Sequence, residues 1–203
     1  PADQGPGEVR LRQTAVGLNF LDVYQRSGLY KWPVERDLVV GNEGAGVVEA
    51  VGAGVTSLSQ GDRVAYAMLI GAYASTRLAP ADRLVRLPDA IPDEVAATVM
   101  LKGMTAHYLI HSTFRVEPGM VVLVHAAAGG GGLILGQWLA AKGVTAIGTA
   151  GGRDKVALAQ AHGYAHVIDY RAEDFAARVA EITGGRGVDV VYDSVARDTW
   201  RGS

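Results

Sequence analysis

The sequence contains no cysteine, which excludes disulfide bonds and thiolate metal sites. No apolar run approaches the roughly 20 residues that a membrane helix requires, and no basic, apolar leader opens the chain. Charge of either sign is not in excess, because 19 Lys and Arg against 21 Asp and Glu give a net charge of −2. That balance offers no electrostatic footprint for nucleic acid or for an acidic membrane. We therefore expect a cytoplasmic protein that binds neither.

Glycine, in contrast, is abundant, at 27 of 203 residues. Because 49% of the chain is hydrophobic, the glycines indicate tight turns and close backbone approaches, and not disorder. The first half predicts short strands between turns, at residues 8–15, 39–54, 63–67 and 84–87, which is typical of a small β-barrel or sandwich. A helical pattern then runs from Pro92 to His107.

Strands and helices alternate in the second half. The pattern predicts strands at residues 121–125, 145–148, 166–169 and 188–192, with helices at 133–141, 155–162 and 175–182. Such alternation indicates parallel βαβ units covered by helices. We place the boundary within the connecting helix and predict domains at residues 1–102 and 103–203.

The strongest chemical pattern is the glycine-rich segment after the first of these strands. Ala127, Gly129 and Gly132 fit the spacing of the dinucleotide fingerprint, with Ala in the first place. Amides at a helix start carry partial positive charge, and small residues allow a pyrophosphate to approach them. A flexible loop is the alternative, but the strand before it, the helix after it and the second strand favour a nucleotide site.

The end of the second strand bears on which nucleotide is bound. An NAD site usually places Asp or Glu roughly 20 residues beyond the glycines, to bind the ribose hydroxyls. Here the strand ends in small residues that include Gly151, and Arg153 and Lys155 follow. Cations at a helix start attract a 2′-phosphate, so the sequence favours NADPH. The alternative is that both cations are ordinary solvated charges.

Together these residues resemble the quinone oxidoreductase and ζ-crystallin branch of the medium-chain dehydrogenase/reductase superfamily. The resemblance covers nearly the whole chain and is carried by residues 19–24, 27–30, 41–46, 61–64, 102–105, the glycine turn with Gln137, and 190–195. It implies a GroES-like β-barrel catalytic domain joined to a Rossmann domain with a doubly wound parallel sheet, and a substrate cleft between them.

At two positions the sequence lacks the zinc ligands that other members of that superfamily have. Its zinc alcohol dehydrogenases have a Cys ligand at the position of Asn19 and a His ligand at the position of Asn42, and the lobe that holds their structural zinc is absent here. Amides are poor zinc ligands. Without a Lewis acid the site is poorly equipped to stabilise an alkoxide, whereas a quinone is already a strong hydride acceptor.

The resemblance also assigns site residues. It implies that Asn19, Tyr24 and Tyr30 line the quinone pocket as catalytic residues, although the two tyrosines could instead be packing aromatics. The cofactor-binding residues that it implies are Lys102, Thr105, Gly129, Gly130, Gly131, Gly132, Leu133, Gly151, Lys155, Tyr170 and Ser194. Gly131 and Ala196 depart from the usual Val and Gly of the family, and we expect the glycine to loosen its helix start.

We therefore predict an NADPH:quinone oxidoreductase that works without metal and forms a homodimer at full length. The alternatives are an NADPH-dependent reductase of alkenals or enones, and an NADPH-binding crystallin-like structural or RNA-associated protein. Against the family's full unit the chain looks truncated at both ends, which would leave residues 188–192 as an uncovered edge strand. We expect His125 to be a hydrogen-bonded core histidine, and Glu43 to make a structural hydrogen bond or ion pair.

Overall fold

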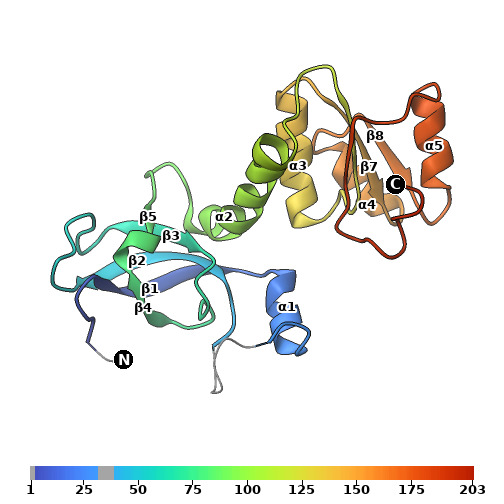
Figure 1. Ribbon diagram of the computed structural model, residues 1–203. Helices are drawn as coiled ribbons and strands as arrows, with labels where there is room; N and C mark the ends of the chain where they lie inside the picture. The colour runs from blue at the N-terminus through green and yellow to red at the C-terminus, as the bar shows by residue number, and fades with distance from the viewer. Residues whose placement is uncertain (1–2, 32–38) are drawn as a thin grey trace. The chain divides into compact units, whose positions relative to one another are not determined.

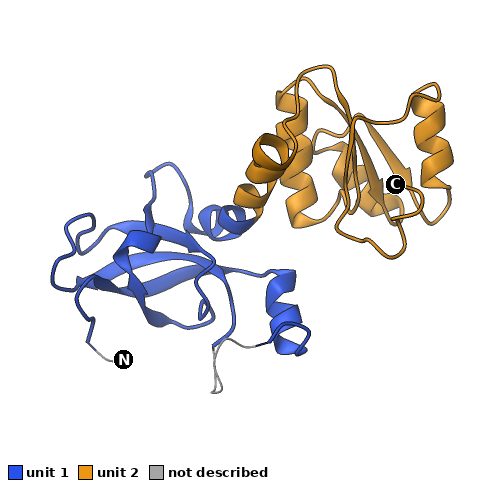
Figure 2. Ribbon diagram, viewed as in Figure 1, with its two compact units in different colours: residues 1–101 blue, residues 102–203 orange. Residues whose placement is uncertain are grey.

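The structure is a computed structural model that describes residues 3–31 and 39–203. The chain divides into two compact units, an N-terminal unit (Pro1–Leu101) and a C-terminal unit (Lys102–Ser203), which are coloured separately in Figure 2. The N-terminal unit contains an antiparallel sheet and the C-terminal unit a parallel sheet, which confirms the predicted fold class. None of the helices in the described ranges has the length and apolar character that crossing a bilayer requires.

Five strands form the sheet of the N-terminal unit: β1 (Glu8–Gly17), β2 (Glu43–Val51), β3 (Arg63–Ala67), β4 (Thr76–Pro80) and β5 (Val85–Arg86). They lie in the order β4-β1-β2-β3-β5, as Figure 1 shows, and each neighbouring pair is antiparallel. The sequence did not predict β4, the short helix α1 (Phe20–Arg26) or the 3-10 turn at Ala81–Arg83. β2 is also shorter than the predicted strand at residues 39–54.

Side-chain alternation along the strands divides the core of this unit in two. Val9 and Leu11 of β1 pack with Val64 and Tyr66 of β3 in the larger cluster. A separate, smaller cluster is made of alanines: Ala45 and Ala65 of the sheet, and Ala96 and Ala97 of helix α2 (Asp93–Tyr108). Small side chains on both elements let the helix approach the strands closely, so α2 is attached to the sheet by its first turns.

The C-terminal unit follows the predicted alternation of strands and helices. Its strands are β6 (Val121–Val124), β7 (Thr145–Ala150), β8 (His166–Asp169) and β9 (Val190–Tyr192), and its helices are α3 (Gly130–Ala141), α4 (Arg153–Gln160) and α5 (Phe175–Ile182). α2 continues into a π-helical turn at Leu109–Thr113. The helix α3 begins at Gly130 and not at Leu133 as predicted, and α4 begins at Arg153 and not at Lys155.

The parallel sheet has the order β8-β7-β6-β9, so β9 is an outer strand. Val122 and Val124 of β6 face the cluster that contains Leu135 of α3 and Ala159 of α4. Leu123, between them, faces the cluster that contains Val179 of α5. Helices therefore cover both faces, with α3 and α5 on opposite sides of the sheet in Figure 1.

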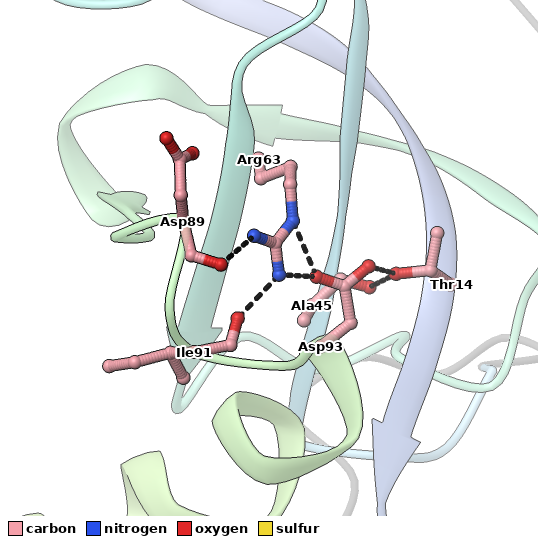
Figure 3. Close-up of polar contacts among 6 residues, drawn as sticks. All are labelled: Thr14, Ala45, Arg63, Asp89, Ile91 and Asp93. Atoms are coloured by element: carbon pink, nitrogen blue, oxygen red, sulfur yellow. Dashed lines mark hydrogen bonds and ion pairs between the residues drawn. The ribbon is translucent and has the colours of Figure 1, made fainter.

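Arg63 is the centre of a polar network that anchors the first turn of α2 to the sheet (Figure 3). Its guanidinium Nε donates to Asp93 Oδ1 at 3.0 Å, and Nη2 donates to the same oxygen at 2.6 Å and to the Ile91 carbonyl at 2.5 Å. Thr14 Oγ1 on β1 donates to Asp93 Oδ2 at 2.6 Å. Asp93 is thus held by two strands at the start of α2, where a carboxylate is also favoured by the helix dipole.

We predict that Arg63→Met lowers the free energy of unfolding by about 1.5–3 kcal/mol, because it leaves a largely buried carboxylate without its charged donor. Arg86→Met is the matched control, since Arg86 pairs with Asp62 at the same 2.6 Å distance but is 58% exposed, against 30% for Arg63. The control should lose less than about 1 kcal/mol. Urea unfolding of both variants measures the difference, and equal losses would contradict this account.

The hydrogen bond from Thr14, with Arg63 in addition, holds the pKa of Asp93 below its usual value. A carboxylate with a lowered pKa in the folded state stabilises the fold above its unfolded pKa, near 3.9, and that stabilisation is lost as the pH falls through the folded value. The stability difference between wild type and Asp93→Asn should therefore be full at pH 7 and shrink below about pH 4. A difference that stays constant from pH 7 to pH 3 would argue against this assignment.

Candidate functional site

The turn between β6 and α3 carries the predicted dinucleotide site. The chain leaves β6, passes Ala126 in the left-handed region at φ 53°, and enters α3 after Gly129. Two backbone hydrogen bonds fix its course, from Ala127 N to the Thr149 carbonyl at 3.0 Å and from Gly129 N to the Ala126 carbonyl at 2.9 Å. The turn is therefore tied to β7 and to itself, and it is not the flexible loop considered from the sequence.

The first turn of α3 presents backbone amides without side chains over them. Leu133 N already donates to the Gly129 carbonyl at 2.8 Å. The amides of Gly130, Gly131 and Gly132 precede it, and amides at the first positions of a helix have no carbonyl within that helix to bind. Gly129, at the N-cap, has no side chain to cap them. The arrangement can hold an anion by its N–H groups and by the helix dipole.

Lys102 of α2 lies beside this helix start. Its Cδ and Cε atoms are 2.9 Å from the point where a Cβ on Gly130 would stand. The methylene part of this side chain therefore runs past the first residue of α3. Thr105 is one turn further along α2 and is partly buried.

Two of the four glycines in this turn, Gly131 and Gly132, differ in the space around them. A Cβ on Gly132 would stand 2.5 Å from the Ala126 carbonyl oxygen and 2.6 Å from that of Ala127, so only glycine fits there. A Cβ on Gly131 would meet nothing within 4 Å, and α3 begins before it in spite of the glycine that we expected to loosen the helix start.

At the end of β7 lie Gly151 and Gly152, and two side chains from the end of β8 cover them. A Cβ on Gly151 would stand 2.4 Å from the Tyr170 hydroxyl oxygen and 3.1 Å from Arg171 Nε. Arg171 was not among the predicted site residues, and its only sequence signal is its position directly after Tyr170. Lys155 is exposed on α4.

An acid also lies at this end of the sheet. It lies at the end of β8, whereas the acid typical of an NAD site would stand at the end of β7. Asp169 Oδ1 accepts hydrogen bonds from Gly152 N at 2.9 Å and from Arg171 N at 3.0 Å. These two backbone donors lower the pKa of Asp169, so it is ionised at neutral pH. Its carboxylate is engaged in closing the loop between β7 and α4.

Parallel strands bring these predicted residues to one edge. Seven of the predicted cofactor residues follow the carboxyl ends of β6, β7, β8 and β9: Gly129, Gly130, Gly131, Gly132, Gly151, Tyr170 and the exposed Ser194. Open α/β sheets bind their ligands at that edge. The structure therefore brings together most of the residues predicted for the cofactor, and their contacts with a cofactor remain a prediction.

In the N-terminal unit the three predicted catalytic residues gather at α1. Asn19 is its N-cap, and the rings of Tyr24 and Tyr30 contact each other at a tilt of 53°, with centroids 5.4 Å apart. Tyr24 is 36% exposed and Tyr30 is 51% exposed, so neither ring is a packed core aromatic. Asn19 Nδ2 donates to Glu43 Oε1 at 2.9 Å, which orients the amide of this side chain.

Two buried carboxylates lie behind Asn19. Glu43 is fully buried, and its Oε2 accepts from Leu101 N at 2.7 Å. Asp22 accepts from Asn42 Nδ2 at 2.6 Å, from Tyr73 Oη at 2.9 Å and from Asn19 N at 2.9 Å. Burial, and then the hydrogen bond to Asp22, raise the pKa of Tyr73 to about 12, so it remains a neutral donor. Glu43 therefore makes the structural hydrogen bonds that the sequence analysis expected.

The donor set near Asn19 does not fit a zinc ion. Asn19 and Asn42 both direct their amide nitrogens at carboxylates, and Asn42 Nδ2 also donates to Gln25 Oε1 at 3.0 Å. An amide N–H cannot ligate a metal. Within residues 3–31 and 39–203 no group of three or more His, Cys, Asp or Glu could hold one either.

Three histidines of the C-terminal unit contact other side chains. His125 is buried, and its ring nitrogens lie 2.9 Å from Thr149 Oγ1 and 3.0 Å from Ser203 Oγ, which confirms the expected hydrogen-bonded core histidine. Burial lowers its pKa. His107 and His111 stack on each other at 4.7 Å. Ala196, where the family usually has Gly, adopts φ 62°, a conformation that costs an alanine roughly 1 kcal/mol.

Comparison with known proteins shows to which family the chain belongs. The family model described as alcohol dehydrogenase GroES-like domain matches residues 5–89, and the one described as zinc-binding dehydrogenase matches residues 130–203. The quinone oxidoreductase of Pseudomonas aeruginosa is 51% identical over 204 residues, and quinone oxidoreductase 1 of Escherichia coli is 48% identical. Each match covers the whole of this chain and 62% of the relative, so the chain spans about three-fifths of the length of these curated relatives.

Solved structures of quinone oxidoreductases have the same fold as this chain. The Escherichia coli quinone oxidoreductase complexed with NADPH has a TM-score of 0.95 at 48% identity, over 99% of this chain and 62% of the other. The Pseudomonas syringae quinone oxidoreductase has the same TM-score and identity, over 100% and 62%. The two family matches show the class of the chain, a GroES-like domain followed by a segment that matches the zinc-binding dehydrogenase model. Within that class, the chain belongs to the quinone oxidoreductase family of the medium-chain dehydrogenase/reductase superfamily.

Because a Cβ has room at Gly131 but not at Gly132, alanine substitutions at these two positions form a matched pair of variants. We predict that Gly131→Ala is neutral or stabilises the protein by up to about 1 kcal/mol, because alanine favours the helix and its Cβ meets open space. Gly132→Ala should destabilise it by more than about 1 kcal/mol, because the Cβ collides with two carbonyl oxygens. Thermal unfolding of both variants measures the pair, and a similar effect of the two would show that the close approach is misplaced.

Replacing the buried acid tests the orientation of Asn19. Glu43→Gln must present its own N–H to either Asn19 Nδ2 or Leu101 N, so one donor loses its acceptor unless the Asn19 amide rotates. We expect a loss of about 1–3 kcal/mol in the free energy of unfolding. Glu49→Gln on the same strand is the control, with an expected loss below about 0.5 kcal/mol, because Glu49 is partly exposed and its ion pairs with Arg10 and Arg12 are 3.5–3.6 Å long.

Proposed function

We propose that the full-length protein transfers a hydride from NADPH to a quinone, without a metal ion. The observation that supports this proposal is the start of α3, where three glycine amides, with the Lys102 side chain beside the first of them, lie at the carboxyl edge of a parallel sheet. The NADPH bound to the Escherichia coli relative supports the choice of cofactor.

The cofactor would extend along that edge. In the proposal the amides of Gly130, Gly131 and Gly132 hold the pyrophosphate, with Gly129 and Leu133 as their frame. Lys155, Tyr170 and Gly151 contact the adenosine end, while Thr105 and Ser194 contact the nicotinamide end. Once bound, the nicotinamide supplies the hydride, and the chain's own groups position it and exclude other reactions.

At the acceptor, Asn19 is the proposed hydrogen-bond donor. One hydrogen of its Nδ2 is directed at Glu43, and the amide has a second hydrogen to donate to a quinone oxygen as negative charge develops on it. The half-exposed rings of Tyr24 and Tyr30 offer an aromatic surface for the quinone ring, and their hydroxyls can donate as well. No Lewis acid is needed, because the reduced oxygens are phenolate-like.

A second candidate is the reduction of an activated alkene. The 2-haloacrylate reductase of a Burkholderia species is 52% identical over 200 residues, which cover 96% of this chain and 60% of that protein. Hydride addition to an α,β-unsaturated carbonyl would need the same cofactor and a donor to the developing enolate oxygen, which Asn19 supplies equally. We further propose that the full-length protein is a homodimer and works in the cytoplasm, which the lack of cysteine favours.

Steady-state NADPH oxidation by the full-length protein tests the proposal, with a panel of quinones and enones and with and without a chelator. We predict that kcat/KM is higher for a quinone than for any enone, that NADPH is preferred to NADH, and that the chelator changes nothing. A higher kcat/KM with an enone would favour the second candidate. Loss of activity with the chelator, or no oxidation with either class of acceptor, would overturn the proposal.

A further inference from the structure

The start of α3 is helical from Gly130 although the chain has four consecutive glycines there, Gly129 to Gly132. Glycine is among the poorest helix formers, because its backbone loses more freedom in a helix than that of any other residue. A first turn made of glycines is therefore unstable unless contacts from outside the helix hold it. In the proposed function the amides of this turn receive the pyrophosphate only while the turn is formed, so such contacts affect cofactor binding.

Tyr164 makes a contact of this kind. It lies in the loop between α4 and β8 and is only 4% exposed. Its hydroxyl donates to the Gly132 carbonyl at 2.7 Å. Burial raises the pKa of Tyr164 above its usual value, so the hydroxyl remains a neutral donor. The bond therefore joins the first turn of α3 to a residue 32 positions further along the chain.

Two further glycines make room for the ring of Tyr164. A Cβ on Gly136 of α3 would stand 2.7 Å from ring atom Cδ2, and a Cβ on Gly148 of β7 would stand 2.9 Å from Cδ1. These atoms belong to opposite edges of the ring, so the ring is wedged between the helix and the strand. The next residue, Ala165, donates its N–H to the Ala146 carbonyl at 2.9 Å, which ties the loop to β7. The hydroxyl is therefore held in place by a side chain with little room to move.

The hydrogen bond acts on the peptide group that joins Gly132 to Leu133. The carbonyl of that group accepts from Tyr164, and its N–H, which belongs to Leu133, donates to the Gly129 carbonyl at 2.8 Å. The peptide group is thus held at both of its polar atoms. Fixing it keeps the first helical hydrogen bond closed, and with it the turn that presents the glycine amides.

We propose that Tyr164 is a positioning residue for the cofactor, whose hydroxyl holds the glycine turn of α3 in helical form before the pyrophosphate binds. This inference depends on the proposed NADPH-dependent function. Tyr164 acts through the Gly132–Leu133 peptide and not by contact with the cofactor, so its loss weakens the binding of NADPH without changing the hydride step. It also accounts for a helix that starts at Gly130 in spite of Gly131, which we expected to loosen it.

Removing one hydroxyl from the full-length protein tests the proposal. Tyr164→Phe keeps the ring in its wedge and loses only the hydrogen bond. Tyr192→Phe is the matched control, because Tyr192 is also buried and its hydroxyl donates to a carbonyl outside the turn, that of Leu109, at 3.0 Å. Both variants should unfold at a lower urea concentration than wild type. Only Tyr164→Phe should raise the dissociation constant and the KM of NADPH, by about 3- to 10-fold, with kcat within about 2-fold of wild type.

A rescue experiment separates the glycine turn from a general loss of stability. Gly131→Ala favours the helix, and its Cβ meets open space. Introduced together with Tyr164→Phe, it should recover most of the lost affinity for NADPH, because the turn then needs less support from outside the helix. Hydrogen exchange of the Leu133 amide in the cofactor-free protein reports on the turn itself, and it should be faster in Tyr164→Phe than in Tyr192→Phe.

The outcomes separate the two proposals. If wild type does not bind NADPH, the proposed function is wrong, and this inference is overturned with it. If wild type binds NADPH and Tyr164→Phe binds it equally well, or Tyr192→Phe weakens binding as much, this inference alone is overturned. Failure of Gly131→Ala to restore affinity would also overturn it. Weaker binding in Tyr164→Phe alone, with recovery by Gly131→Ala, supports it.

Discussion

The close approach of Gly132 to the carbonyl oxygens of Ala126 and Ala127 is the contact on which the site of the C-terminal unit depends. It packs the start of α3 directly against the end of β6, with no side chain between them. The amides that begin the helix are then left open at the carboxyl edge of the sheet, and the hydrogen bond from Ala127 to Thr149 joins this turn to β7. The adenosine end of the proposed cofactor follows from that connection.

Carboxylates that accept hydrogen bonds play a related part in both units. Asp169 accepts from two backbone amides to join β7 and β8, and Glu43 accepts from Asn19 and from Leu101 N. Asp169 fixes the loop between β7 and α4, and Glu43 orients Asn19, which we propose to touch the substrate. A hydrogen bond between residues 24 positions apart in the sequence therefore orients the Asn19 side chain.

The parallel unit could be predicted because its evidence is local: apolar strands, periodic helices and glycines at a fixed spacing. β4 and α1 were missed for physical reasons. β4 contains Arg77 and ends in Pro80, and α1 has only seven residues and exposes Phe20 to 75%, so neither has a hydrophobic pattern. Spacing also identified the phosphate turn. It could not identify the bond from Asn19 to Glu43, 24 residues away, or Arg171, whose position depends on the pairing of β7 with β8.

The central claim is that bare amides at the start of α3 bind the pyrophosphate of NADPH. Proton–nitrogen NMR of the full-length protein, with the amides of Gly130, Gly131 and Gly132 assigned, tests it most directly. The account predicts that these three amide protons move downfield together as NADPH is added and saturate with one dissociation constant. Saturated binding of NADPH that leaves all three resonances in place would contradict it.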